Sequence, residues 1–155
     1  MTPSPSKGLV KSSSSHRSLV FHSEEWTARN LSSDYQEIQI RTLTAWVNAQ
    51  LKEQAIIDMR KDLQDGRQLL RLLATVEDDD DDAPKPEKGR MRIHQLSNVA
   101  QALSFLAKRH DDVPDIGNEA IVNGDLKRTL ALLFYIMTKY QFQPILDDPS
   151  LKVNN

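Results

Sequence analysis

The sequence predicts an all-α domain, and three observations carry the prediction. Apolar residues recur at steps of three and four along stretches that begin near residues 38, 95 and 125. A shorter stretch, residues 67–76, is apolar around almost its whole circumference. No alternating pattern typical of a strand rivals these periodicities. We therefore expect a compact domain of four main helices plus one or two short ones within the 155-residue chain.

The first helix is expected to begin near Ile38. Its apolar stripe consists of Ile40, Leu43, Val47 and Leu51. Trp46 widens this stripe and is predicted to belong to the core. An Asp65-Gly66 pair then favours a turn, from which the second helix can start at about Arg67. Because leucines surround that helix, we expect it to be buried on several sides.

An acidic run separates the second helix from the third. Glu77 is followed by five aspartates, and two prolines come shortly afterwards, at positions 84 and 86. Like charges repel one another and proline disfavours regular structure, so residues 77–86 are predicted to form an exposed loop. The third helix is expected over 95–109, with His94 capping or packing near its start. His110, at its breaking end, is expected to be solvated.

A short helix is predicted over 118–123 and the last long helix over 125–141. Asp125 is a suitable N-cap for the latter. The following side chains are expected to line its inner side: Leu126, Leu130, Leu133, Phe134, Met137 and Tyr140. Pro144 should prevent the helix from continuing.

These patterns divide the chain into three parts. Residues 1–33 hold ten serines and little apolar periodicity, and we predict a disordered tail. Residues 34–143 form the domain, and residues 144–155 have a linker-like composition. Residues 34–155 contain 16 Lys and Arg against 20 Asp and Glu, six of these acids lying in 77–82, so the domain is mildly basic apart from its acidic loop.

Composition excludes several classes of function. The chain has no cysteine and a net charge of −2, which argues against thiol chemistry, zinc fingers and a dedicated nucleic-acid-binding domain. Its glycines form no phosphate-binding motif, and a calcium loop starting at Asp78 fails at Ala83 and Gly89. The longest apolar run is residues 130–137, too short to span a bilayer. We therefore expect a cytoplasmic protein that is not an enzyme, without cofactor, metal site or membrane insertion.

Three stretches together resemble one known family. Residues 40–51 read IRTLTAWVNAQL, residues 62–73 read DLQDGRQLLRLL, and residues 84–99 read PKPEKGRMRIHQLSNV. A weaker fourth match spans Ile116 to Asp125. The whole, about residues 36–142, resembles the calponin-homology (CH) domain, and more narrowly the first CH domain of the actin-binding region in α-actinin, spectrin and dystrophin-type proteins.

The resemblance implies a module that binds filamentous actin within an actin-crosslinking or cytoskeletal protein, by adhesion and without chemistry. It points to one surface on the opening helix and a second on the short and last helices. The first comprises Gln39, Arg41, Thr42, Thr44, Ala45 and Asn48. The second comprises Ile116, Ile121, Val122, Lys127, Arg128, Thr138, Lys139 and Gln141.

The sequence also departs from the family pattern. Asn123 and Asp125 exchange the usual order of Asp and Asn, and Ala131 and Phe134 replace the usual Gly and Trp. A second CH domain is absent from these 155 residues. These departures motivate an alternative, a CH-type protein-interaction scaffold or signalling module without actin binding.

Overall fold

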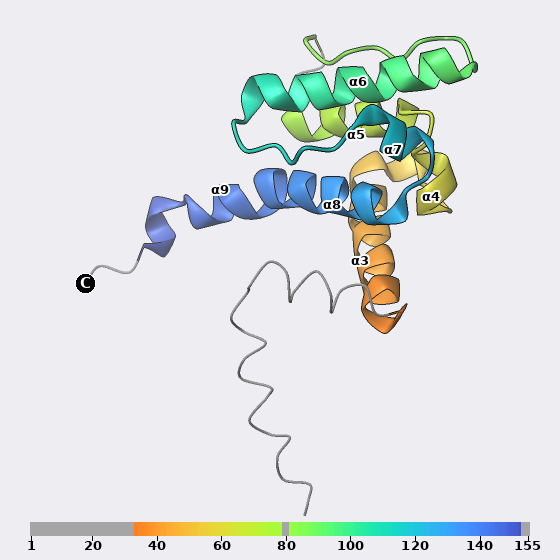
Figure 1. The fold of residues 1–155 in the computed structure, drawn as a ribbon. Coiled ribbons are helices and arrows are strands. Elements are labelled where there is room, and N and C mark those ends of the chain that lie inside the picture. Colours follow the sequence, from red (N-terminus) through yellow and green to blue (C-terminus); the bar gives the residue numbers. More distant parts are fainter. Residues whose placement is uncertain (1–32, 79–80, 153–155) are drawn as a thin grey trace, which may run out of the picture. The chain divides into compact units, whose positions relative to one another are not determined.

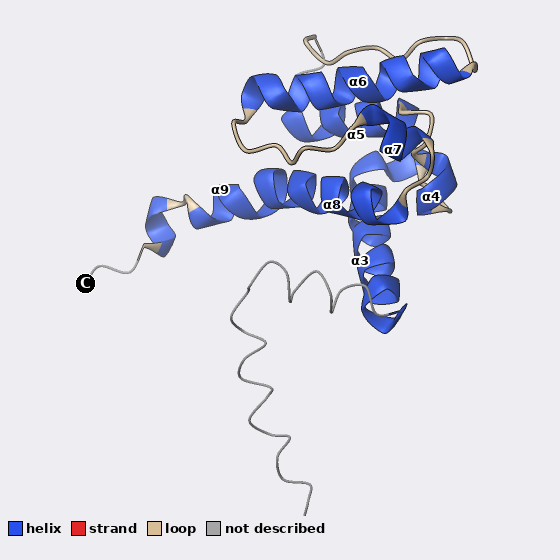
Figure 2. Ribbon diagram, in the orientation of Figure 1, coloured by secondary structure: helices blue, strands red, loops and turns tan. Residues whose placement is uncertain are grey.

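A computed structural model describes residues 33–78 and 81–152, and within these ranges the chain is helical with no strand (Figure 1, Figure 2). The all-α prediction is confirmed. The chain divides into one unit that ends at Ile38 and a second unit, Gln39–Asn155, which contains the core. The predicted serine-rich tail lies outside the described residues, apart from Ser33. Nowhere in the described ranges is a helix long and apolar enough to cross a membrane.

The four expected main helices are present. They are α3 (Ser33–Leu51), α5 (Arg67–Glu77), α6 (Arg92–Arg109) and α8 (Leu126–Met137). Short helices α4 (Met59–Asp62), α7 (Asn118–Val122) and α9 (Gln143–Leu146) accompany them, together with 3-10 turns at Lys52–Gln54 and Pro149–Leu151. The α6 helix begins three residues earlier than predicted, because His94 Nδ1 accepts the N–H of Met91 at 3.3 Å and so caps its first turn.

The end of the last helix differs from the prediction. After Met137 the chain widens into a π-helical turn, Thr138–Phe142, and then continues as α9. Gln143 donates its N–H to the carbonyl of Thr138, and Pro144 occupies the first turn of the new helix. Proline is tolerated there, since the N–H groups of a first turn have no partner within the helix. Pro144 therefore does not stop the helical path, and the linker-like segment begins with helix.

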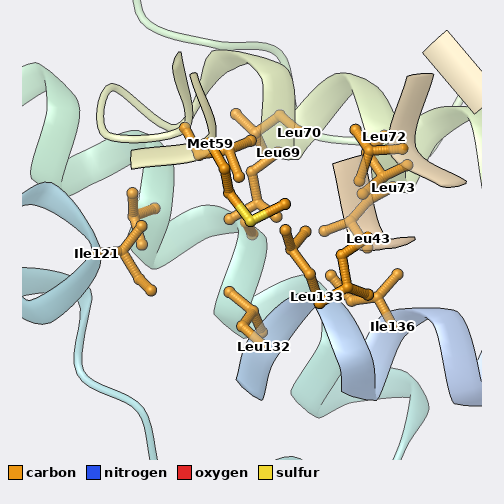
Figure 3. Close-up of a cluster of buried hydrophobic side chains, with 14 of the residues drawn as sticks. Leu43, Met59, Leu69, Leu70, Leu72, Leu73, Ile121, Leu132, Leu133 and Ile136 are labelled. Carbon is orange, nitrogen blue, oxygen red and sulfur yellow. The ribbon is translucent and has the colours of Figure 1, made fainter. Parts of the chain in front are cut away.

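The core gathers side chains from every long helix. Leu69, Leu70, Leu72 and Leu73 of α5 are each exposed by 1% or less, which confirms that this helix is buried on several sides. Figure 3 shows Leu72 and Leu73 beside Leu43 of α3 and Ile136 of α8. These contacts pack one face of α3 and one face of α8 against the same core, and the opposite faces stay exposed to solvent.

The turn before α5 requires glycine. Gly66 has φ +77°, and a Cβ added there would lie 2.6 Å from Cβ of Asn98. Asp65 Oδ1 accepts the N–H of Arg67 at 3.0 Å, and Asn98 Nδ2 donates to the Asp65 carbonyl at 2.9 Å. The predicted Asp-Gly turn is thus a close contact between the start of α5 and the middle of α6.

Candidate functional site

The outward face of α3 holds most of the first predicted surface. Arg41, Thr42 and Ala45 are exposed, whereas Gln39 and Thr44 are half-buried. Ala45 lies four positions after Arg41 and three after Thr42, so the three exposed residues are neighbours on one side of the helix. Together they combine a guanidinium with small side chains that permit close approach.

Asn48, also predicted for this surface, is hydrogen-bonded within the fold. Its Nδ2 donates to the carbonyl of Ile56 at 3.0 Å, and its Oδ1 accepts the N–H of the same residue at 2.7 Å. Both ends of the carboxamide are therefore used to hold the chain that follows α3. These hydrogen bonds give Asn48 a role in the fold, and its contact with a partner stays a prediction.

Three residues of the second predicted surface lie in the core. Ile116 is 9% exposed, Ile121 1% and Val122 4%. Ile121 and Val122 lie on α7, which turns its apolar side chains inward against α6 and α8. That these three residues contact a partner stays a prediction, and their burial speaks against it. Of this segment, Gly117 and Glu119 remain exposed.

The outward face of α8 begins with two basic residues. Lys127 and Arg128 are exposed in its first turn. Arg128 Nε lies 3.4 Å from Oδ2 of Asp125, which also caps the helix by accepting the N–H of Arg128 at 3.1 Å. The N-cap prediction for Asp125 is confirmed. Lys127 forms no ion pair within the described part of the chain, so its charge is available to a partner.

Two further residues on this face escaped the sequence prediction. Phe134, expected in the core, is 46% exposed, and Ala131 is exposed as well. Together with Lys127 and Thr138 they follow the steps of four, three and four that place residues on one helix face. Counting these steps from Lys127 would have placed Ala131 and Phe134 on the outward face. Because the segment is apolar around much of its circumference, this pattern was not evident from the sequence.

The C-terminal end of this face is tied to the protein itself. Thr138 donates its hydroxyl to the carbonyl of Phe134 at 2.8 Å, within the helix. Gln141 is exposed, and its Oε1 accepts the indole N–H of Trp46 at 3.4 Å. Trp46 is half-buried and packs against the core as predicted. The contact joins α3 to the π-helical turn.

Lys139 is held by an aspartate. Its Nζ lies 2.6 Å from Oδ2 of Asp112, and the other oxygen of that carboxylate accepts the hydroxyl of Tyr135 at 2.7 Å. The hydrogen bond from Lys139, followed by that from Tyr135, lowers the pKa of Asp112. Lys139 therefore presents a largely compensated charge.

A second polar cluster fixes the two ends of the acidic loop. Arg109 lies 3.4 Å from Glu77 and 2.7 Å from Asp82. Tyr140 donates its hydroxyl to Glu77, and burial, followed by this hydrogen bond, raises its pKa. His110 Nε2 lies 3.1 Å from the same hydroxyl. His110 is thus half-buried in a network and is not solvated as predicted. The acidic loop begins beside the π-helical turn that carries Lys139 and Gln141.

Over the residues that it describes, the structure thus defines an all-helical domain with outward faces on α3 and α8. The family model of the calponin homology (CH) domain matches residues 37–142. Sarcomeric alpha-actinin of Drosophila melanogaster is 35% identical over 125 residues, covering 79% of this chain and 13% of that protein. The erythrocytic spectrin beta chain of Mus musculus is 38% identical over 117 residues, covering 74% and 5%. Human alpha-actinin-1 is 36% identical over 126 residues, covering 79% and 14%.

The chain belongs to the calponin-homology family. It spans only 5–14% of the length of these relatives, so it corresponds to one small part of each of them. The resemblance seen in the sequence is confirmed over nearly the whole described domain.

Proposed function

We propose that this chain is an actin-binding CH module of the α-actinin and spectrin type, acting without chemistry on a substrate at the actin cytoskeleton in the cytoplasm. The observation that carries the proposal is that α3 and α8 keep Arg41, Thr42, Ala45, Lys127 and Arg128 outside while their other faces are buried. The family resemblance assigns filament contact to these two faces. Neither a cofactor nor a metal is part of the proposal.

The faces suit a large, acidic protein partner. Small and apolar residues on α3 and α8, including Phe134, can supply buried area, and Arg41, Lys127 and Arg128 can supply positive charge. Complementary charge accelerates encounter and selects orientation. The acidic loop begins beside the π-helical turn, where Tyr140 holds Glu77, and should oppose an acidic filament. Salt will weaken both the attraction and this opposition.

Reversal of two charges tests the proposal. The R41E/K127E variant should bind filamentous actin about tenfold or more weakly in co-sedimentation, because each change places like charge against the filament. K108E/K152E makes the same total charge change at two exposed lysines outside the proposed faces and should bind as the wild type does. Equal binding by both variants, with helicity unchanged, would contradict the proposed surface.

A CH-type scaffold or signalling module without actin binding is the second candidate. One observation favours it: Ile116, Ile121 and Val122 are buried, while Asn48 and Lys139 are occupied within the fold. Fewer of the residues implicated by resemblance are therefore available to a filament. This function predicts that the folded wild-type chain fails to co-sediment with actin.

A further inference from the structure

The segment leading into α6 presents an exposed basic and apolar surface made of residues that belong to neither of the two helix faces. Lys85, Lys88, Arg90 and Arg92 are all exposed, as is Glu87, which is the one acid of residues 83–93. Met91 is 68% exposed and Ile93 is 66% exposed. We call residues 85–93 the basic segment. Large apolar side chains left in water beside several positive charges are typical of an interaction site.

Hydrogen bonds from Arg67 and Asn98 hold the backbone of the basic segment in place. The Nη2 atom of Arg67 approaches the carbonyl oxygens of Glu87, Lys88 and Gly89 at 3.1, 2.9 and 3.3 Å. Asn98, only 1% exposed, accepts the N–H of Glu87 at 2.7 Å. The backbone is thus fixed by the protein, while the basic and apolar side chains stay outside. A surface ordered in advance loses little entropy when it binds.

Charge is segregated along α6. Figure 1 shows the loop running beside this helix, from its C-terminal to its N-terminal end. Arg109 holds Asp82 at one end, and the basic segment leads into the other. At 1.5 Å per residue the two ends of α6 are about 25 Å apart, which exceeds the Debye length of about 8 Å at physiological salt. Asp82 and the acids before it therefore do little to cancel the positive potential of Arg90 and Arg92 at the other end of the helix.

The start of α6 adds to this potential. Its first turn holds no acidic residue and begins with Arg92. The positive end of a helix dipole favours acidic side chains, so a basic residue there works against the stability of the helix. No described residue forms an ion pair with Arg90 or Arg92. Within the described part of the chain, their charges are therefore not neutralised by an ion pair.

We propose that the basic segment adsorbs to an anionic lipid bilayer at the level of the headgroups. Clusters of four or more Lys and Arg bind anionic leaflets, and exposed Met and Ile side chains can enter the acyl boundary between the headgroups. A nucleic acid would meet the charges, but it accepts side chains such as Met91 and Ile93 only where a base step is forced open, at a cost of a few kcal/mol. The contact with the bilayer is peripheral and is made by side chains of the loop before α6 and of the first turn of α6. This proposal does not depend on actin binding.

Vesicle co-sedimentation of the full 155-residue chain tests this proposal. Vesicles with 30% phosphatidylserine in phosphatidylcholine should pellet the chain at 0.1 M salt, and pure phosphatidylcholine should not. Each basic residue near such a surface contributes about fivefold in affinity, so R90E/R92E should bind at least about 25-fold more weakly. M91S/I93S should lose about tenfold or more, since two apolar side chains no longer enter the boundary.

A matched variant controls for net charge. K108E/K152E makes the same charge change as R90E/R92E at exposed lysines outside both the basic segment and the proposed actin-binding faces. It should keep its vesicle binding, and R90E/R92E should keep its actin binding. Three results would overturn the proposal: no phosphatidylserine-dependent binding by the folded wild type, an equal loss in both charge variants, or loss of actin binding by R90E/R92E while vesicle binding persists. The last would make the basic segment a filament contact.

Discussion

Replacing Asn98 by alanine should destabilise the domain more than a change of this size usually does. The side chain is 1% exposed and bridges two elements: Oδ1 accepts the N–H of Glu87 at 2.7 Å, and Nδ2 donates to the carbonyl of Asp65 at 2.9 Å. Alanine leaves one donor and one acceptor without their partner. Each such loss costs about 1–3 kcal/mol, and we take the lower half because both backbone groups are only partly buried.

The expected loss is therefore about 2–4 kcal/mol in the free energy of unfolding, or a fall of roughly 10 °C in melting temperature. Urea unfolding followed by circular dichroism at 222 nm measures the free energy of unfolding, and a thermal scan measures the melting temperature. Ser104 is exposed on the same helix, and S104A should change the free energy by less than about 0.5 kcal/mol. If N98A and S104A proved equally stable, Asn98 would not be the bridge that we describe.

Further predictions concern the site and its surroundings. N48A should lower the free energy of unfolding by about 1–3 kcal/mol, since the backbone of Ile56 loses both partners, yet leave actin affinity unchanged; weaker binding by the folded variant would place Asn48 on the contact surface. Asp112 has a lowered pKa in the fold, so its contribution to stability is present above the ordinary aspartate pKa of about 3.9 and is lost as the pH falls through the lowered value. The melting temperature of D112N should therefore lie below that of the wild type at pH 6 and approach it at the lowest pH at which both remain folded, and a constant difference would refute this. Replacing the acids at 78–81 by asparagine, with Glu77 and Asp82 kept for Arg109, should strengthen actin binding at low salt, and unchanged co-sedimentation would show that the loop does not face the filament.

Periodicity predicted the fold well because the core depends on it. The leucines of α5 are buried, and the Asp65-Gly66 turn, the His94 cap and the Asp125 cap occur where local chemistry places them. The π-helical turn was not predictable from pattern. It depends on how tertiary contacts, such as that between Tyr140 and Glu77, hold the end of α8, and no local residue preference encodes them.

The site was predicted less well, for a physical reason. Resemblance transfers positions but not the contacts that each side chain makes. Exposure separates Arg41 and Lys127 from the buried Ile121, and hydrogen bonding separates Asn48 from its neighbours on α3. Phe134 was misplaced because α8 is apolar on more than its inner face. Only long-range partners, such as Asp112 for Lys139, show which charges remain available.

Co-sedimentation of the 155-residue chain with filamentous actin, at low and near-physiological salt, tests the central claim most directly. We predict saturable pelleting that weakens as salt rises, because basic side chains on α3 and α8 contribute to the contact. A folded, helical chain that stays in the supernatant at both salt concentrations would contradict actin binding by this domain and favour the scaffold function.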